Sequence, residues 1–118
     1  MPHIKEGVSL EVDTLISKKN VELLKALADE TRLKILKLLG DEEKCQCDII
    51  PAMGKSQSTI SQHLQILINS GVLDYRKEGQ RSLYKLKDER IRKIIELIGS
   101  ISKDSLLELS KLAKSIKE

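Results

Sequence analysis

The hydrophobic pattern of the chain changes from helical spacing to strand alternation at Gly71, and this change limits the folds that it can adopt. Before Gly71, leucines and isoleucines recur every three or four residues, as on the buried face of a helix. After it, residues 72–76 and 81–86 are typical of short strands, and Gly79 between them can supply the positive φ of a hairpin turn. The length of 118 residues is that of one domain. We therefore expect a single domain over residues 1–118 that is mostly α with a small β-hairpin.

Helices before the hairpin are predicted from apolar spacing and from residues that favour helix ends. Residues 1–8 are expected to form a loose arm, and residues 9–28 one or two helices with a break near residues 18–20. Asp29 can accept a hydrogen bond from a free first-turn amide, so it is expected to cap the next helix. Gly40 is expected to end that helix.

Two more helices are predicted before Gly71. The first is a short helix near residues 47–53, in which Pro51 is tolerated only in a first turn. The second follows Ser56, which is a suitable N-cap. Its inward face carries Ile60, Leu64 and Leu67. Another face carries uncharged polar residues at helical spacing, namely Ser58, Ser61, Gln62 and Gln65.

This polar stripe is unusual in a chain with 33% charged residues, because a face meant only for water would carry Lys and Glu. Ser and Gln side chains can hydrogen-bond to base edges instead. The alternative is a small solvated face. The hairpin beside the stripe carries Arg76, Lys77 and Arg81 near its tip, which together outline a winged helix-turn-helix that places a helix in the major groove and a basic wing on the phosphates.

The charge distribution agrees with a DNA-facing half. Residues 55–93 contain nine Lys and Arg and four Asp and Glu, an excess of five positive charges, whereas the whole chain has a net charge of +3. With two tyrosines and no Phe or Trp, the chain lacks the aromatic platforms on which single-stranded nucleic acids stack. Double-stranded DNA is therefore the expected partner.

Residues 88–118 carry two apolar stripes that a domain of this size cannot easily bury. Asp88 is expected to cap a helix whose stripe contains Ile91, Ile94, Ile95 and Ile98. Gly99-Ser100 either bends or ends that helix, and a further stripe contains Leu106, Leu109, Leu112, Ala113 and Ile116. We expect these C-terminal helices to form a homodimer; docking onto the first helix of the same chain is the alternative.

Other classes of protein fit the sequence less well. The chain has two histidines, no Gly-rich phosphate loop and no pair of carboxylates spaced for catalysis, so it is not expected to be an enzyme. The N-terminal residues lack the apolar segment of a signal peptide, and no run of 18 apolar residues is present. A cytoplasmic protein without membrane contact is expected. A winged-helix module that binds proteins rather than DNA remains an alternative.

Several motifs in fixed order resemble the ArsR/SmtB family of small winged-helix repressors. They lie at residues 27–36, 56–64, 67–73 and 76–84. The resemblance implies a homodimer held by the first and last helices, a double-stranded operator with two-fold symmetry, and release from DNA by an inducer. Some family members sense no metal.

The resemblance also implies roles for individual residues. The stretch that reads bases in such proteins contains Gln57, Ser58, Ser61, Gln62 and His63, and Gln65 extends the same stripe. An amide of Gln57 or Gln62 suits adenine, while Arg76, Lys77 and Arg81 are expected to hold the backbone. For His63 the alternative is a flank position beside Leu64 and Leu67.

Residues 43–49 resemble the cysteine box of arsenic and cadmium sensors in the family. Cys45 and Cys47 can both reach a soft ion such as As(III), Cd(II) or Zn(II), and no cofactor is otherwise required. The chain has no third cysteine, so His3, Asp48 or Glu43 would have to complete the site. Alternatively, the two thiols form a redox-active disulfide, or they are small buried apolar residues.

A second metal site of the family begins at a position matched by Asp88. Arg90 stands where its first histidine would fall, and no histidine follows in that helix. Sensing through that site is therefore not expected.

Overall fold

The computed structural model describes the backbone of residues 2–117 and the side chains of residues 10–116. The chain divides into two units, Met1–Lys87 and Asp88–Glu118. The second unit contains one helix, α5 (Glu89–Lys117). The first unit contains the elements α1 (Pro2–Leu27), α2 (Glu30–Leu39), β1 (Lys44–Cys45), α3 (Gln46–Met53), α4 (Gln57–Asn69), β2 (Leu73–Glu78) and β3 (Arg81–Leu86).

The predicted hairpin is confirmed and belongs to a three-stranded antiparallel sheet of order β1-β3-β2. Tyr75 lies opposite Tyr84 within the hairpin, and Gly79 at its tip has a φ of 63°. The third strand, β1, places Cys45 opposite Leu83 of β3. Two residues are too few to show strand alternation, so β1 could not be recognised in the sequence.

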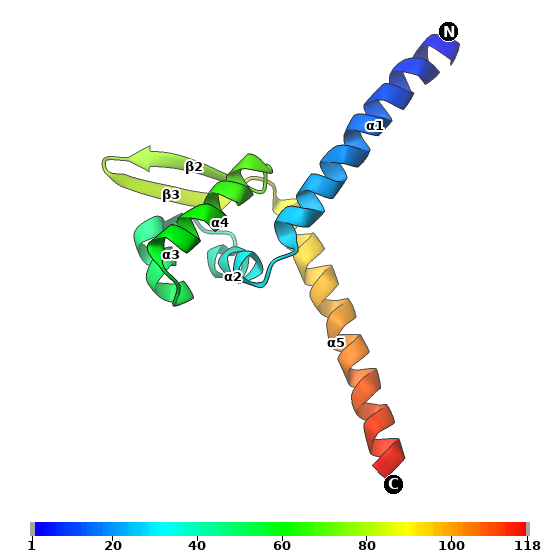
Figure 1. Ribbon diagram of the computed structural model, residues 1–118, viewed down its shortest axis with the longest axis vertical. Helices are drawn as coiled ribbons and strands as arrows, with labels where there is room; N and C mark the ends of the chain where they lie inside the picture. The colour runs from blue at the N-terminus through cyan, green and yellow to red at the C-terminus, as the bar shows by residue number, and fades with distance from the viewer. Residues whose placement is uncertain (1, 118) are drawn as a thin grey trace. The chain divides into compact units, whose positions relative to one another are not determined.

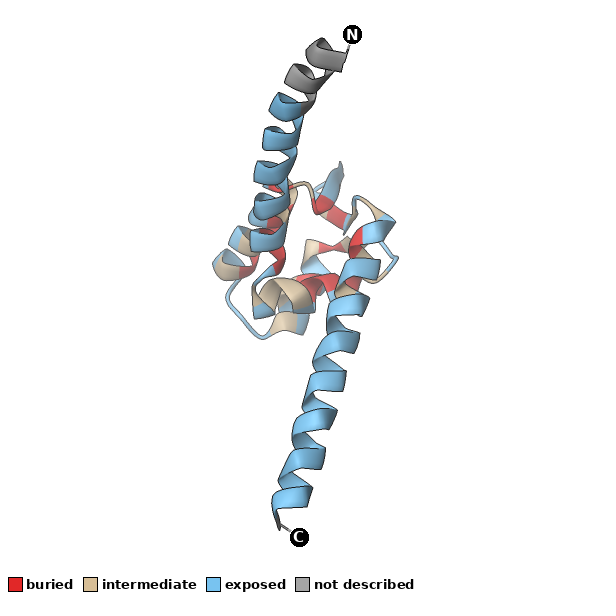
Figure 2. Ribbon diagram, turned by 90° about the vertical axis from the view of Figure 1, so that its right-hand side faces the viewer, coloured by how far each residue is buried: buried red, intermediate tan, exposed pale blue. Residues whose placement is uncertain are grey.

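The core of the first unit is aliphatic. Its fully buried side chains come from α2, α3, α4, the loop residue Val72 and the first residue of β2, and α4 lies between the hairpin and α2 (Figure 1). The largest of them are Ile35, Leu39, Ile49, Ile60, Leu64, Leu67, Val72 and Leu73. By contrast, α1 is exposed along most of its described side chains, and only its last residues, Ala26 and Leu27, are buried (Figure 2).

The predicted helix caps are confirmed. Asp29 Oδ1 accepts a hydrogen bond from the Arg32 amide at 3.0 Å, and Ser56 Oγ accepts one from the Thr59 amide at 3.2 Å. Gly40 ends α2 with a φ of 56°. These local signals therefore fix where α2 and α4 begin.

Two predictions about α1 are wrong. The helix starts at Pro2, so residues 2–8 are not a loose arm, and it runs without a break through residues 18–20. The physical reason is that proline fits the first helical position, while Lys18, Lys19 and Asn20 only lower helix propensity slightly. Lys19 also bonds to the Ser70 carbonyl at 2.9 Å, which holds that part of α1 against the end of α4.

Two further details differ from expectation. Pro51 is the sixth residue of α3 rather than part of its first turn, so the Cys47 carbonyl lacks the amide partner that another residue would provide. In the second unit, α5 continues through Gly99 and Ser100, so residues 100–117 do not form a separate helix. One glycine costs a helix only about 1 kcal/mol, too little to end it.

None of the helices in the described part of the chain combines the length and the apolar character needed to cross a membrane.

We predict that Asp29→Ala lowers the free energy of unfolding by about 1 kcal/mol, because the first turn of α2 loses its cap. The bond from the Arg32 amide lowers the pKa of Asp29 below its ordinary value of 3.8. This contribution is therefore present above about pH 4 and is lost as the pH falls through the folded-state pKa. Denaturant titrations at pH 7 and pH 3 measure it. The exposed neighbour Glu30→Ala is the control, and equal effects of the two substitutions would contradict the capping role.

Candidate nucleic-acid interface and cysteine pair

The polar stripe of α4 lies on the surface, opposite the buried face of the helix. Gln57, Ser58 and Gln62 are exposed, while Ile60 and Leu64 on the other side are at most 1% exposed. These three polar side chains are therefore available to a groove of DNA.

Three members of the stripe have side-chain partners, and the first is Ser58, whose Oγ lies 3.3 Å from Ser56 Oγ. Gln65 is exposed, and its Nε2 donates to Asn69 Oδ1 at 2.8 Å. Ser61 is half-buried, and its Oγ accepts a hydrogen bond from Gln46 Nε2 at 2.9 Å. Ser61 therefore links α4 to α3.

His63 lies on the flank of α4, away from the stripe. Its side chain is 18% exposed, and its Nδ1 lies 3.2 Å from Arg32 Nη1 and 3.9 Å from Asp29 Oδ1. A guanidinium only donates, so in a hydrogen bond between these two side chains Nδ1 is the acceptor. His63 is thus tied to the α1–α2 corner, and its contact with DNA stays a prediction.

The three basic residues of the hairpin are not equivalent. Arg76 donates to both carboxylate oxygens of Glu43, at 2.8 and 3.0 Å, and lies 3.1 Å from Glu78. The hydrogen bond from Arg76 lowers the pKa of Glu43, so this pair stays charged. Lys77 and Arg81 are exposed, and no carboxylate pairs with them among side chains 10–116. These two residues, more than Arg76, are free to meet phosphates.

The cysteine pair lies where β1 meets α3. Cys45 is the last residue of β1 and the N-cap of α3, and its Sγ accepts a hydrogen bond from the Cys47 amide at 3.1 Å. Cys45 is buried at 2% exposure, whereas Cys47 is exposed. A disulfide joins them, with their Cα atoms 5.1 Å apart.

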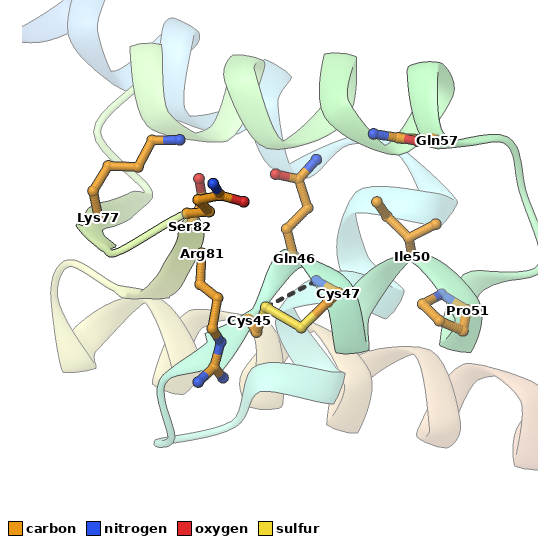
Figure 3. Close-up of a pocket in the computed structure, with 10 residues that line it drawn as sticks. Cys45, Gln46, Cys47, Ile50, Pro51, Gln57, Lys77, Arg81 and Ser82 are labelled. Atoms are coloured by element: carbon orange, nitrogen blue, oxygen red, sulfur yellow. Dashed lines mark hydrogen bonds between the residues drawn. A yellow bond between two sulfur atoms is a disulfide. The ribbon is translucent and has the colours of Figure 1, made fainter.

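An open pocket of about 470 Å³ brings this pair next to the predicted DNA-facing residues (Figure 3). Its lining includes Cys45, Gln46, Cys47, Gln57, Lys77 and Arg81. A change at the sulfurs would therefore occur beside both the N-terminus of α4 and the tip of the hairpin.

The donor set for a metal ion is incomplete within this chain. No group of three His, Cys, Asp or Glu side chains suited to a metal exists among the residues described. Glu43 is paired with Arg76, and Asp48 is exposed in the first turn of α3. The side chain of His3 lies outside the described residues. Two sulfurs suit a soft ion, but a further ligand must come from elsewhere.

Gln46 is a site residue that the sequence analysis missed. Its side chain is half-buried between α3, α4 and β3, and it contacts both Ser61 and Tyr84. The sequence signal that could have pointed to Gln46 is its position as a polar residue between Cys45 and Cys47.

Comparison with known proteins identifies the family. A sequence model described as bacterial regulatory protein, arsR family, matches residues 29–75. MJ1325, an HTH-type transcriptional regulator of Methanocaldococcus jannaschii, is 44% identical over 84 residues, which is 70% of this chain and 94% of that protein. The chain belongs to the ArsR family. It is accordingly a DNA-binding transcriptional regulator with a winged helix and not an enzyme.

Two more ArsR-family relatives inform the site. The cadmium resistance regulatory protein CadC homolog of Staphylococcus aureus is 42% identical over 76 residues, 64% of this chain and 63% of that protein. The homodimeric winged helix-turn-helix domain Mb0332 of Mycobacterium bovis has a TM-score of 0.71 and 30% identity, covering 77% of this chain and 84% of that one.

The predicted dimer face of this ArsR-family chain lies on α5. Ile94 and Ile98 are 42% and 46% exposed, Ile95 is half-buried, and Ile91 is 8% exposed and has little surface left for a partner. The exposed apolar positions that share this face continue along the helix at Ile101, Leu109, Leu112 and Ile116. An apolar face of this length is typical of an interaction surface.

We predict that Ile94→Asp combined with Ile98→Asp yields monomers in sedimentation velocity, because two carboxylates would be buried in the dimer. The control is Lys93→Asp combined with Ser100→Asp, which places two carboxylates on the opposite face of α5. A dimer that survives the first pair would move the interface away from these isoleucines.

Proposed function

We propose that this protein is a sequence-specific regulator of transcription, a homodimeric repressor that leaves a two-fold symmetric DNA operator when the Cys45/Cys47 pair changes state. The observation that carries the proposal is the exposed, uncharged face of α4 beside a basic hairpin tip, with the two cysteines in the pocket between them. Such a regulator acts in the cytoplasm, where the genome lies.

In this proposal α4 enters the major groove. The amides of Gln57 and Gln62 can each give adenine a donor and an acceptor, and Ser58 contributes a hydroxyl at the groove edge. Lys77 and Arg81 hold phosphates, while Arg76 remains with Glu43 and contributes less. A dimer would contact two half-sites roughly 10 base pairs apart, one turn of the duplex.

The first candidate input is a soft ion, As(III), Cd(II) or Zn(II), bound by both thiolates. The donor chemistry supports it, as does the similarity to a relative named for cadmium resistance. The described residues provide no third ligand for this ion. The third ligand would therefore be His3 of a second copy of the chain or a solvent molecule. The bound ion would supply a link between the two sulfurs.

The second candidate input is dithiol–disulfide exchange, which the disulfide between Cys45 and Cys47 favours. A cellular dithiol would give two electrons and two protons to the protein disulfide, leaving two protein thiols and an oxidised dithiol. Disulfides in the cytosol are usually transient and regulatory, which suits a signal rather than a structural staple.

We predict that Gln62→Ala weakens binding to the operator about tenfold and changes binding to unrelated duplex little, because the lost amide reads a base. Fluorescence anisotropy on both duplexes measures this. Lys77→Ala is the companion variant: it should weaken both and reduce the slope of log affinity against log salt by about one. An equal loss on both duplexes for Gln62→Ala would contradict base reading.

We predict that one of four reagents, As(III), Cd(II), Zn(II) or a thiol oxidant, lowers operator affinity of the reduced protein at least about fivefold. Cys45→Ser and Cys47→Ser should each abolish the response, since both sulfurs are needed. A response to an ion identifies the first input, and a response to the oxidant alone identifies the second. If the protein binds the operator and no reagent changes its affinity, both candidate inputs are contradicted. If it does not bind the operator at all, the alternative of a winged-helix module that binds proteins is favoured.

A further inference from the structure

Gln46 connects the two elements that the proposed function places on DNA. Its Nε2 donates to Ser61 Oγ of α4 at 2.9 Å, and its Oε1 accepts from the Tyr84 hydroxyl of β3 at 3.3 Å. Figure 3 shows the side chain rising from the cysteine pair toward the helix that carries Gln57. One side chain thus bridges the base of the wing and the proposed recognition helix.

The β3 end of this bridge is fixed. Tyr84 is 7% exposed, its ring stacks on Tyr75 at 6.0 Å, and its backbone lies opposite Lys44 of β1. Burial raises the pKa of Tyr84, so its hydroxyl keeps the proton that it donates to Gln46. A displacement of Gln46 is therefore not absorbed by Tyr84.

The α4 end lies within the DNA-facing stripe. Ser61 immediately precedes Gln62 and stands one helical turn after Ser58. Ser61 is half-buried and its hydroxyl bonds to Gln46 of α3, whereas Ser58 and Gln62 are exposed. Holding or releasing Ser61 therefore changes how firmly the stripe is held.

The backbone of Gln46 is controlled by the two sulfurs. Cys45 and Cys47 flank it directly, and their bond closes a small ring that contains the whole Gln46 backbone. Cys45 is also held opposite Leu83 in the sheet. When the sulfurs separate, or bind one ion at a longer sulfur–sulfur distance, the ring constraint on Gln46 changes while Cys45 stays in place.

We propose that Gln46 is the positioning residue that couples the state of the Cys45/Cys47 pair to α4, through its hydrogen bond to Ser61. The inference rests on the proposed function, because it needs DNA binding that responds to the cysteines. It adds the route by which the signal leaves the pair.

The primary test compares operator affinity of the disulfide and the dithiol forms, and of the dithiol form with and without Cd(II), in wild type and in Gln46→Met. Methionine keeps the approximate volume and removes both hydrogen bonds. We expect the larger of the two affinity ratios in wild type to be at least about fivefold and to fall below about twofold in the variant. Gln80→Met is the matched control, since Gln80 lines the same pocket and should leave the ratio unchanged.

A reciprocal measurement separates coupling from a structural role. By linkage, operator DNA must shift the dithiol–disulfide equilibrium, or the Cd(II) affinity, of wild type by the same factor. The dithiol–disulfide equilibrium of the protein is set with mixtures of a small dithiol and its oxidised form. The protein disulfide is reduced as the small dithiol is oxidised. Gln46→Met should remove the DNA-induced shift. A residue that only stabilises the fold would leave that shift intact.

Ser61→Ala approaches the same bond from the other side and serves if Gln46→Met folds poorly. It should lower the affinity ratio as Gln46→Met does, and the double variant should lower it no further. A wild-type ratio that persists in Gln46→Met or Ser61→Ala would overturn the role of Gln46 alone. If the operator affinity of the wild-type protein is the same in both comparisons, DNA binding does not respond to the cysteines. That result would overturn the proposed response and the role of Gln46 with it.

Discussion

The burial of one face of α4 determines how the rest of the site is presented. Ile60, Leu64 and Leu67 are each at most 1% exposed, and full burial of such side chains contributes about 1.5–3 kcal/mol apiece. Turning α4 by one residue would rotate it by about 100° and exchange apolar for polar side chains in the core. The core therefore fixes which residues reach the surface, and Gln57 and Gln62 are among them.

The corner between α1 and α2 holds α4 from the opposite side. Arg32 donates to the Ala26 carbonyl at 2.6 Å and to the Lys25 carbonyl at 3.1 Å, at the end of α1, where the Lys25 carbonyl also accepts from the Ala28 amide at 3.2 Å. The same guanidinium bonds to His63 of α4. A single half-buried arginine thus joins the end of α1 to the flank of α4.

Local patterns predicted the parts of this structure that local forces determine. The caps Asp29 and Ser56, the hairpin at Gly79 and the two faces of α4 each follow from a few neighbouring residues. What the sequence did not reveal is set by contacts between distant segments. Arg76 is paired with Glu43, 33 residues away, and Gln46 bonds to Ser61, 15 residues away. The continuity of α5 through Gly99 was also missed, because one glycine weakens a helix without ending it.

The position of the cysteine pair is what lets the proposed signal reach both elements that the proposal places on DNA. Cys45 belongs to the sheet through its pairing with Leu83, and it also caps α3. The adjacent Gln46 reaches α4. A change at a sensor on a loop tip would not be transmitted to other elements. A sensor at a strand–helix junction shares its backbone with a strand and a helix that both pack against the core. The proposed coupling therefore requires no large rearrangement: it requires only that the Gln46 side chain gain or lose its hydrogen bond to Ser61 across the boundary between α3 and α4.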